Sequence, residues 1–476
     1  MQIGELKVEE ILDSREEGTI QVTIANEFGV FIGSSPSGKS TGKYEAPVYR
    51  SGLAGDIEAV RANEKAIKEL YFDKFGDLIK LELLLRRYVG ANTLIALESA
   101  ILKAMAVEKK MQVWQIINPD AERLPIPIVN MIGGGKHTRE KVKPDFQEFI
   151  VVPQGESFRE NENIVKDIYN KIGNKLRWKE KRLFLSRNDE GAYNTRMNSM
   201  ETLEFLSQFN VKLGLDIAAS SFYKSEHYLY SNPVRILSRE DQIKSMVNTI
   251  QNHNLFYVED PLDEEDFHGF AKLVKETDAL ITGDDLIATH PERLKKAIND
   301  KAVRAIIVKP NQSGSLLEVK KVVELAKAND IKTIMSHRSG ETDDSILADL
   351  AFAFQTDFIK ISLGKGRETK WARLASIEKS FAEPEVVGEE IEGSVGMDGE
   401  KKENMIEDEE APIMICQPVH TKVKEEVKES YKEKAVREMK EKAKTPGFDS
   451  KYGRQGIDKK MGDSSKYKYG FEKDKK

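Results

Sequence analysis

The sequence is poor in cysteine, since Cys416 is the only one among 476 residues. A single thiol cannot close an intramolecular disulfide, and by itself it cannot build a thiolate metal site. So little cysteine is typical of a protein in the reducing cytoplasm, and that is the location we expect.

Long apolar runs are missing as well. No stretch approaches the ~18 consecutive apolar residues that a membrane helix requires, so we expect no membrane span. The opening segment, MQIGELKVEEILDSREEGTI, carries acids early and has no apolar centre, so we expect no signal peptide. With 39% hydrophobic and 32% charged residues, the composition predicts a globular protein of two or three domains.

The net charge of −6 hides a segregation of charge along the chain. Residues 1–377 carry 53 Lys and Arg against 56 Asp and Glu, which is close to neutral. Residues 378–420 carry 3 against 13, and residues 421–476 carry 18 against 11. Such blocks predict a folded body followed by a largely disordered extension over 381–476, acidic at first and then basic.

The basic end of this extension leaves two interpretations open. It can be a solvated tail, or it can be a segment that binds nucleic acid or protein. The second interpretation is suggested by aromatic residues interleaved among lysines, as in segments whose aromatic rings stack on bases: Tyr452, Tyr467, Tyr469 and Phe471.

From about residue 120, short β-branched runs alternate with helical patterns. The runs that end in polar or charged residues are VKLGLD, LFYVED, ALITGDD, RAIIVK, IKTIMSH and DFIKIS. After the first gap they recur every 23 to 28 residues, which is the length of one strand–helix unit. Six consecutive units favour a closed parallel β/α barrel over 121–380 rather than an open doubly wound sheet.

Residues 1–120 follow a different pattern. Alternating strands are predicted in GELKVEEIL, TIQVTIANE and GVFIGSS, and helices are predicted around 53–70, 78–88 and 93–109. This order of elements predicts a separate α+β domain that caps the barrel.

The segment GSSPSGKSTG, residues 33–42, matches the phosphate-binding pattern G-x-x-x-x-G-K-[ST] letter for letter. In nucleotide hydrolases a long helix follows this loop directly, and its N-terminal amides bind the phosphates. Here Gly42, Pro47 and Gly52 interrupt the residues that would form that helix. We therefore interpret the match as coincidental.

Charged residues stand at the ends of the predicted barrel strands, where such barrels carry out their chemistry. Asp216, Glu259 and Asp284 supply three carboxylates, a set of hard oxygen ligands that suits Mg²⁺. Lys309 and Lys360 end two further strands, and a lysine crowded by a metal and other cations can have a lowered pKa and act as a base.

Between the two lysines lies the tripeptide His337-Arg338-Ser339, whose last two side chains can bind a phosphate or carboxylate. A single acid or lysine after a strand is more often a helix cap or a solvated end. The joint occurrence of three acids, two lysines and this tripeptide instead indicates proton abstraction next to a carboxylate, with a metal stabilising an enolate-like intermediate.

Longer motifs make the chain similar to a known family. They are IGGGKH, QEF, DEGA, GLDIAAS, VEDPLDEED, GDDL, VKPNQSG and SHRSGETDD, together with PSGKSTG, which differs from the family pattern at one position. Over about residues 1–380 the sequence resembles enolases (phosphopyruvate hydratases), especially archaeal ones. The resemblance implies an enolase-type β/α barrel preceded by an α+β capping domain, with residues 33–42 forming a catalytic lid loop.

The resemblance also implies an activity, the reversible dehydration of 2-phosphoglycerate to phosphoenolpyruvate in glycolysis and gluconeogenesis. Two Mg²⁺ ions are implied, the second bound together with the substrate. Asp216, Glu259 and Asp284 match the ligands of the tighter ion, and Ser40 matches the loop serine that binds the second. Family members commonly form homodimers or larger homo-oligomers, so we expect one here.

The remaining site residues take their expected roles from the same resemblance. Lys309 matches the base that removes the C2 proton, and Glu190, with Glu148 beside it, matches the acid that assists loss of the C3 hydroxyl. The residues that match substrate contacts are Lys360 on the carboxylate, Arg338 and Ser339 on the phosphate, and His137 and His337 closing over the substrate.

Several positions depart from the family pattern. DSREEGTI stands where DSRGNPTV is usual, and Thr138 and Arg139 replace Ala and Gly in a loop that is one residue longer. Lys39 replaces a small residue of the lid loop. It can point inward, to contact the phosphate or compete with the second Mg²⁺, or outward, which we prefer.

Three functions therefore stay open. The first is an active enolase, the second an enolase-fold enzyme that acts on a related phosphorylated or acidic substrate. The third is a scaffold or regulatory paralogue whose tail binds a partner. The intact set of strand-end acids and lysines favours the first, because a scaffold has no physical need of it.

Overall fold

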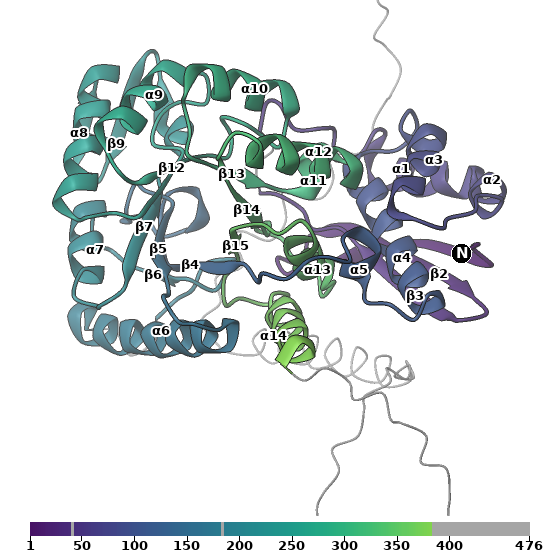
Figure 1. Cartoon of the computed structure of the whole chain (residues 1–476). Helices are drawn as coiled ribbons and strands as arrows, with labels where there is room; N and C mark the ends of the chain where they lie inside the picture. The colour runs from purple at the N-terminus through teal and green to yellow at the C-terminus, as the bar shows by residue number, and fades with distance from the viewer. Residues whose placement is uncertain (40–41, 182–184, 383–476) are drawn as a thin grey trace, which may run out of the picture. The chain divides into compact units, whose positions relative to one another are not determined.

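The computed structural model describes residues 1–39, 42–181 and 185–382, which belong to one compact unit, Met1–Gly388. Figure 1 shows this unit as a small sheet with helices beside a barrel surrounded by helices. The predicted extension lies outside the described residues from 383 onward, and so does Ser40. Within the described residues, no helix has the length and apolar character needed to cross a bilayer.

The first part of the chain forms a three-stranded antiparallel sheet of β1 (Glu5–Leu12), β2 (Gly18–Asn26) and β3 (Gly29–Ser34), in that order. Every second residue of β2 faces the core, because the strand repeats every two residues: Ile20, Val22 and Ile24 are buried. The helices of this part are α1 (Gly52–Ala62), α2 (Glu64–Lys68), α3 (Leu78–Leu85), α4 (Ala91–Glu108) and α5 (Val113–Ile117). These elements confirm the strands and helices predicted before residue 120.

No helix follows the loop at 33–42 among the described residues, since α1 begins only at Gly52. A nucleotide-binding loop of the hydrolase type needs that helix to present its amides to the phosphates. The structure therefore supports the interpretation that the GKS match is coincidental.

Eight strands close into the barrel. They are β4 (Ile126–Gly133), β5 (Glu148–Val152), β7 (Lys212–Asp216), β11 (Tyr257–Glu259), β12 (Leu280–Gly283), β13 (Ala305–Val308), β14 (Lys332–Ser336) and β15 (Phe358–Lys360). Each pairs with the next in this order, and β15 returns to pair with β4. All six runs predicted from the sequence are strands of this barrel.

One strand departs from the expected parallel sheet, because β5 runs antiparallel to both β4 and β7. Between β4 and β5 the chain forms only the short helix η2 (Gly135–His137) and irregular loop. A parallel neighbour requires a crossover segment, usually a helix that packs on the sheet, whereas an antiparallel neighbour does not. A strand pair without that crossover helix therefore runs antiparallel.

Helices cover the outside of the barrel (Figure 1). They are α6 (Phe158–Glu180), α7 (Ser199–Leu206), α8 (Arg239–Asn252), α9 (Phe267–Glu276), α10 (Pro291–Asp300), α11 (Pro310–Ser313), α12 (Leu316–Lys327), α13 (Ile346–Ala353) and α14 (Glu368–Ala382). Ser157, Ser238 and Ser315 begin three of them, and each side chain accepts a hydrogen bond from a backbone N–H in the first turn. The smaller strands are β6 (Tyr193–Asn194), beside β4, and a ribbon of β8 (Tyr223–Lys224), β9 (His227–Ser231) and β10 (Val234–Leu237).

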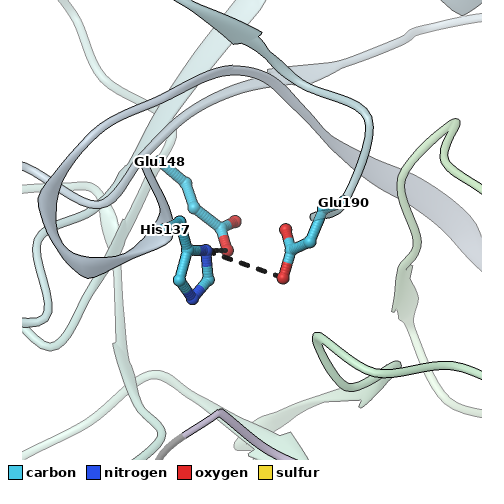
Figure 2. Close-up of side chains that lie close together, drawn as sticks. All are labelled: His137, Glu148 and Glu190. Carbon is cyan, nitrogen blue, oxygen red and sulfur yellow. Dashed lines mark ion pairs between the residues drawn. The ribbon is translucent and has the colours of Figure 1, made fainter. Parts of the chain in front are cut away.

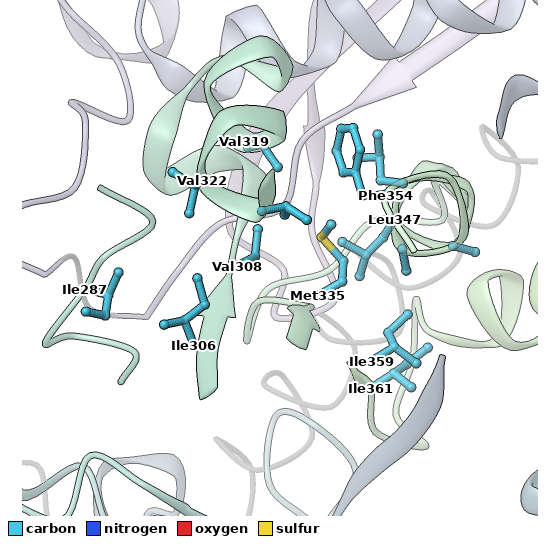
Figure 3. Close-up of a cluster of buried hydrophobic side chains, with 14 of the residues drawn as sticks. Ile287, Ile306, Val308, Val319, Val322, Met335, Leu347, Phe354, Ile359 and Ile361 are labelled. Carbon is cyan, nitrogen blue, oxygen red and sulfur yellow. The ribbon is translucent and has the colours of Figure 1, made fainter. Parts of the chain in front are cut away.

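Alternation along each strand separates the two apolar clusters of the barrel. In β13, Ile306 and Val308 join the large cluster beneath the helices, which Figure 3 shows with Val319 of α12 above Val308. Ala305 and Ile307 belong instead to the small cluster that fills the barrel interior. Successive side chains of a strand point to opposite faces, so β13 contributes to both clusters.

The same alternation directs the strand-end residues inward. Tyr257 lies in the interior cluster, so Glu259, two residues later, faces the interior as well. Phe358 places Lys360 on the inner face of β15 in the same way. The charged ends predicted from the sequence therefore converge at one mouth of the barrel.

Candidate active site

Three carboxylates lie in one row across the mouth of the barrel. Asp216 of β7 is the register partner of both Glu148 on β5 and Glu259 on β11. The Nζ atom of Lys360 lies 3.1 Å from Glu148 Oε2, 3.0 Å from Asp216 Oδ2 and 2.6 Å from Glu259 Oε2. Burial lowers the pKa of Lys360, but the three carboxylates outweigh it and raise this pKa well above its usual value.

Lys309 follows β13 and forms an ion pair with Asp284, whose Oδ1 also accepts a hydrogen bond from Gln312 Nε2 at 3.3 Å. Burial works to lower the pKa of Lys309, but the Asp284 carboxylate outweighs it and raises the pKa. The expectation of a lowered lysine pKa is therefore not met in this arrangement. Burial also works to raise the pKa of Asp284, and the pairing with Lys309 holds it below its usual value.

A second cluster joins His137 to two glutamates (Figure 2). His137 Nδ1 lies 3.5 Å from Glu148 Oε1 and 3.6 Å from Glu190 Oε1, and both carboxylates are buried. Burial raises the pKa of Glu148 well above its usual value. Burial acts in the same direction on Glu190, but its neighbours, among them the permanent cation Arg367, hold the pKa of Glu190 below its usual range. The two acids therefore favour different protonation states, Glu148 neutral and Glu190 ionised.

The loop after β14 carries His337, Arg338 and Ser339, all buried. Arg338 Nη1 donates to Glu45 Oε2 and to Asn311 Oδ1, both at 3.0 Å. This ion pair joins the barrel to the segment that follows the predicted lid loop. Burial, with a smaller contribution from nearby cations, lowers the pKa of His337 well below its usual value.

A single cavity of about 400 Å³ brings the predicted site together. Its walls include every predicted site residue except Glu259, which is buried beneath it, and Ser40, which lies outside the described residues. Lys39 also lines this cavity, and its Nζ lies 2.8 Å from Asp189 Oδ2. Lys39 is an exposed residue that lines the cavity, so its side chain points neither wholly outward nor deep into the site, and its ammonium pairs with Asp189.

Asp216, Glu259 and Asp284 are residues at the mouth that could hold a divalent cation. Glu259 Oε1 is buried and has no hydrogen-bond partner among the described residues. Burial, together with the neighbouring Asp216, raises the pKa of Glu259 to about 8, so a further positive charge is favourable there. Asp216, Glu259 and Asp284 come from neighbouring strands and offer oxygen ligands of the kind that Mg²⁺ prefers.

Three residues of the site were not predicted from the sequence. Glu45 and Asn311 hold Arg338, and Arg367, fully buried, donates to His337 Nδ1 at 3.0 Å. Arg367 follows the last barrel strand in the segment GKGRETK, where charge on an otherwise irregular loop was the only available signal. None of the three ends a predicted strand, so the strand-end argument could not select them.

Comparisons with known proteins agree with this geometry. The family profile described as "Enolase, C-terminal TIM barrel domain" matches residues 121–393. The chain is similar to a protein named Enolase from Archaeoglobus fulgidus, 33% identical over 398 residues that cover 79% of this chain and 97% of that protein. Proteins of the same name from Thermoplasma acidophilum and Sulfurisphaera tokodaii are 33% and 35% identical, and the matches cover 98% and 96% of their lengths.

Proposed function

The chain belongs to the enolase family, and we propose that it catalyses the reversible dehydration of 2-phosphoglycerate to phosphoenolpyruvate. The observation that carries the proposal is one cavity that holds Lys309, Lys360 and the His137–Glu148–Glu190 cluster. A base, a cation for the substrate carboxylate and a proton donor for the leaving hydroxyl are the three groups that this reaction needs.

We propose that Lys309 removes the C2 proton. This proton is weakly acidic, because its removal adds charge next to a carboxylate that is already ionised. We infer that Lys360, an ammonium among the carboxylates of the mouth, binds that carboxylate and offsets the charge that develops there. If another cation held Asp284, Lys309 would lose the carboxylate that does most to raise its pKa, whereas burial and the nearby Arg338 and Lys360 would still lower that pKa.

The site is proposed to hold two Mg²⁺ ions, one on Asp216, Glu259 and Asp284, and a second that Ser40 helps to bind. Bound Mg²⁺ would supply positive charge to the substrate carboxylate as the enolate forms.

Loss of the C3 hydroxyl requires a proton. Glu148 and Glu190 face the same imidazole of His137, and their pKa values are pushed in opposite directions. Such a pair can hold one proton between two carboxyl groups, ready to be passed to the departing oxygen. We infer that the neutral Glu148 holds this proton at rest and passes it to Glu190, which delivers it to the departing oxygen, and that the reverse reaction returns it.

The phosphate is proposed to lie against Arg338 and Ser339, with His137 and His337 on either side of the substrate. Ser339 Oγ already accepts hydrogen bonds from the Lys39 amide at 2.9 Å and from Arg15 Nη1 at 3.2 Å, so its position is fixed before substrate enters. Fixed hydrogen-bonding groups need no reorganisation when charge develops, which is how a preorganised site lowers a barrier.

We also infer a cytoplasmic location and a homo-oligomer. The single cysteine supports the first inference. For the second, Val30 and Ile32 expose 66% and 46% of their surface on the outer side of β3, which is unusual for large apolar side chains on a folded domain. Light scattering on the full chain would give its mass, and a monomer at micromolar concentration would contradict the second inference.

A direct assay tests the proposed activity. Purified protein with 2-phosphoglycerate and Mg²⁺ should form phosphoenolpyruvate, followed by its ultraviolet absorbance, and chelation of the metal should stop the reaction. A folded preparation that forms no product with this substrate would contradict the proposal and leave the related-substrate and scaffold functions.

A further inference from the structure

Lys39 joins two loops on different sides of the active-site mouth. Its backbone N–H donates to Ser339 Oγ at 2.9 Å, next to an antiparallel bridge in which Ser37 and Gly340 exchange hydrogen bonds of 2.8 and 2.9 Å. Its side chain extends to Asp189, with Nζ 2.8 Å from Oδ2. The backbone is therefore fixed to the loop after β14, while the ammonium reaches the loop that carries Glu190.

Several hydrogen bonds hold the loop around Glu190, so a displacement of Asp189 is passed on to its neighbour. Asn188 Oδ1 accepts hydrogen bonds from the backbone N–H of Glu190 at 3.0 Å and of Ala192 at 2.9 Å. Ser362 Oγ donates to the carbonyl oxygen of Glu190 at 2.6 Å. The ion pair between the side chains of Asp189 and Lys39 is a further contact that holds this loop.

In the described part of the chain, Lys39 and Asp189 share no further ion-pair partner, although Lys39 also acts electrostatically on the nearby Lys143. Within residues 1–39, 42–181 and 185–382, Lys39 and Asp189 form ion pairs only with each other, and their side chains are 32% and 26% exposed. Partial burial makes such a pair stronger than one on the open surface, where ion pairs contribute little. A small residue, as the enolase pattern has at this position, could not reach Asp189.

We propose that Lys39 is a positioning residue, which by pairing with Asp189 holds Glu190 in place at the mouth of the barrel. This inference rests on the proposed function, because Glu190 is the proposed proton donor. Lys39 itself need not touch the substrate. Its effect should appear mainly in kcat, since a displaced acid slows the chemical step more than it weakens binding.

Lys39→Ala and Asp189→Asn test the proposal with full-length protein. Each should lower kcat about five- to twentyfold, and the double variant should be no slower than either single one, because both changes remove the same pair. Lys39→Arg keeps the charge and the reach, and should restore at least half of kcat. Additive losses, or a Lys39→Ala protein with unchanged kcat, would overturn the proposal.

The same loop offers a matched control. Lys43 Nζ lies 3.1 Å from Glu265 Oε1, another ion pair from this segment to a barrel loop, but Glu265 has no proposed catalytic neighbour. Lys43→Ala should therefore leave kcat within about twofold of the wild type. Thermal unfolding of all variants separates a positioning effect from a loss of stability, because a positioning role predicts little change in Tm.

A second measurement does not depend on turnover. Asp189→Asn should raise the rate of tryptic cleavage after Lys39 at least threefold, because a lysine without its ion-pair partner binds more readily in the active site of trypsin. Glu265→Gln should raise the rate of cleavage after Lys43 only. Mass spectrometry identifies the cleaved bond. An unchanged rate after Lys39 would contradict the pairing even in an inactive protein, whereas a raised rate without activity would contradict only the proposed reaction.

Discussion

Arg367 donates from Nε to Nδ1 of His337 at 3.0 Å, and this contact determines which nitrogen of the imidazole bears its proton. With Nδ1 as the acceptor, a neutral His337 carries hydrogen on Nε2, and the neighbouring cation helps burial to keep the ring neutral by lowering its pKa. Arg367 Nη2 also donates to the carbonyl oxygens of Arg338 and Ser339 at 2.9 and 3.0 Å. One buried guanidinium therefore orients the whole loop proposed to bind the phosphate.

Arg367→Lys should lower kcat/KM about 10- to 100-fold, because an ammonium cannot reproduce the planar fork that holds three acceptors. The loss is measured by steady-state kinetics, with Tm followed in parallel. Arg373→Lys is the matched control, since Arg373 pairs with Asp349 at 2.6 Å away from the site and should affect stability alone. Equal kcat/KM for the two variants would contradict the role of Arg367.

Lys309→Ala should reduce kcat by roughly 10²- to 10⁴-fold, the range expected when a positioned general base is removed. Lys332→Ala provides the comparison, because Lys332 begins β14 at the opposite end of the barrel and is exposed. A Lys309→Ala protein that keeps full turnover would show that another group removes the proton.

Glu259→Gln should weaken Mg²⁺ binding by at least about tenfold, because the change removes a negative oxygen ligand from the carboxylate row. Calorimetric titration of substrate-free protein with Mg²⁺ measures this directly. Glu276→Gln, at the exposed end of α9, should bind the ion as the wild type does. Unchanged affinity after Glu259→Gln would place the ion elsewhere.

The pH dependence of stability should reflect Glu98, which is fully buried in α4 near Glu82 and accepts a hydrogen bond from the Leu316 amide. Burial raises the pKa of Glu98 well above its usual value of 4.5, so the folded chain keeps a proton that the unfolded chain loses. This proton contributes its full stabilisation at a pH below the pKa that Glu98 has in the unfolded chain. The stabilisation is lost as the pH rises through the pKa that Glu98 has in the folded chain.

Glu98→Gln cannot ionise, and its amide can donate to the nearby Glu82. The Tm of this variant should therefore fall less between pH 5 and pH 8 than the Tm of the wild type does. A difference of about 1 kcal/mol in the free energy of unfolding corresponds to a difference of a few degrees in Tm. Glu69→Gln, an exposed glutamate, should follow the wild-type curve. Parallel curves for Glu98→Gln and the wild type would show that Glu98 is ionised in the folded protein.

Removal of residues 383–476 should leave kcat/KM within about twofold of the full chain, because all proposed site residues precede this segment. Kinetics of the two proteins side by side provide the measurement. A loss of tenfold or more would assign the segment a part in catalysis or in holding the fold together.

The sequence by itself determined the local structure and much of the chemistry. β-branched runs such as RAIIVK favour buried strands, and strand alternation directs the residue after each run to a predictable face. For that reason the order of residues along the chain was enough to select Asp216, Glu259 and Lys309 as candidate site residues. Strand propensity and the two-residue alternation of side chains depend only on residues that are neighbours in the sequence, so both can be predicted from the sequence.

Only the tertiary structure decided which of these residues meet. Lys360 and Asp216 are 144 positions apart, and they come into contact because β15 closes the barrel against β4. The antiparallel direction of β5 and the buried Arg367 behind His337 were not foreseen for the same reason. Strand register and barrel closure depend on contacts between segments distant along the chain, and no local pattern encodes those contacts.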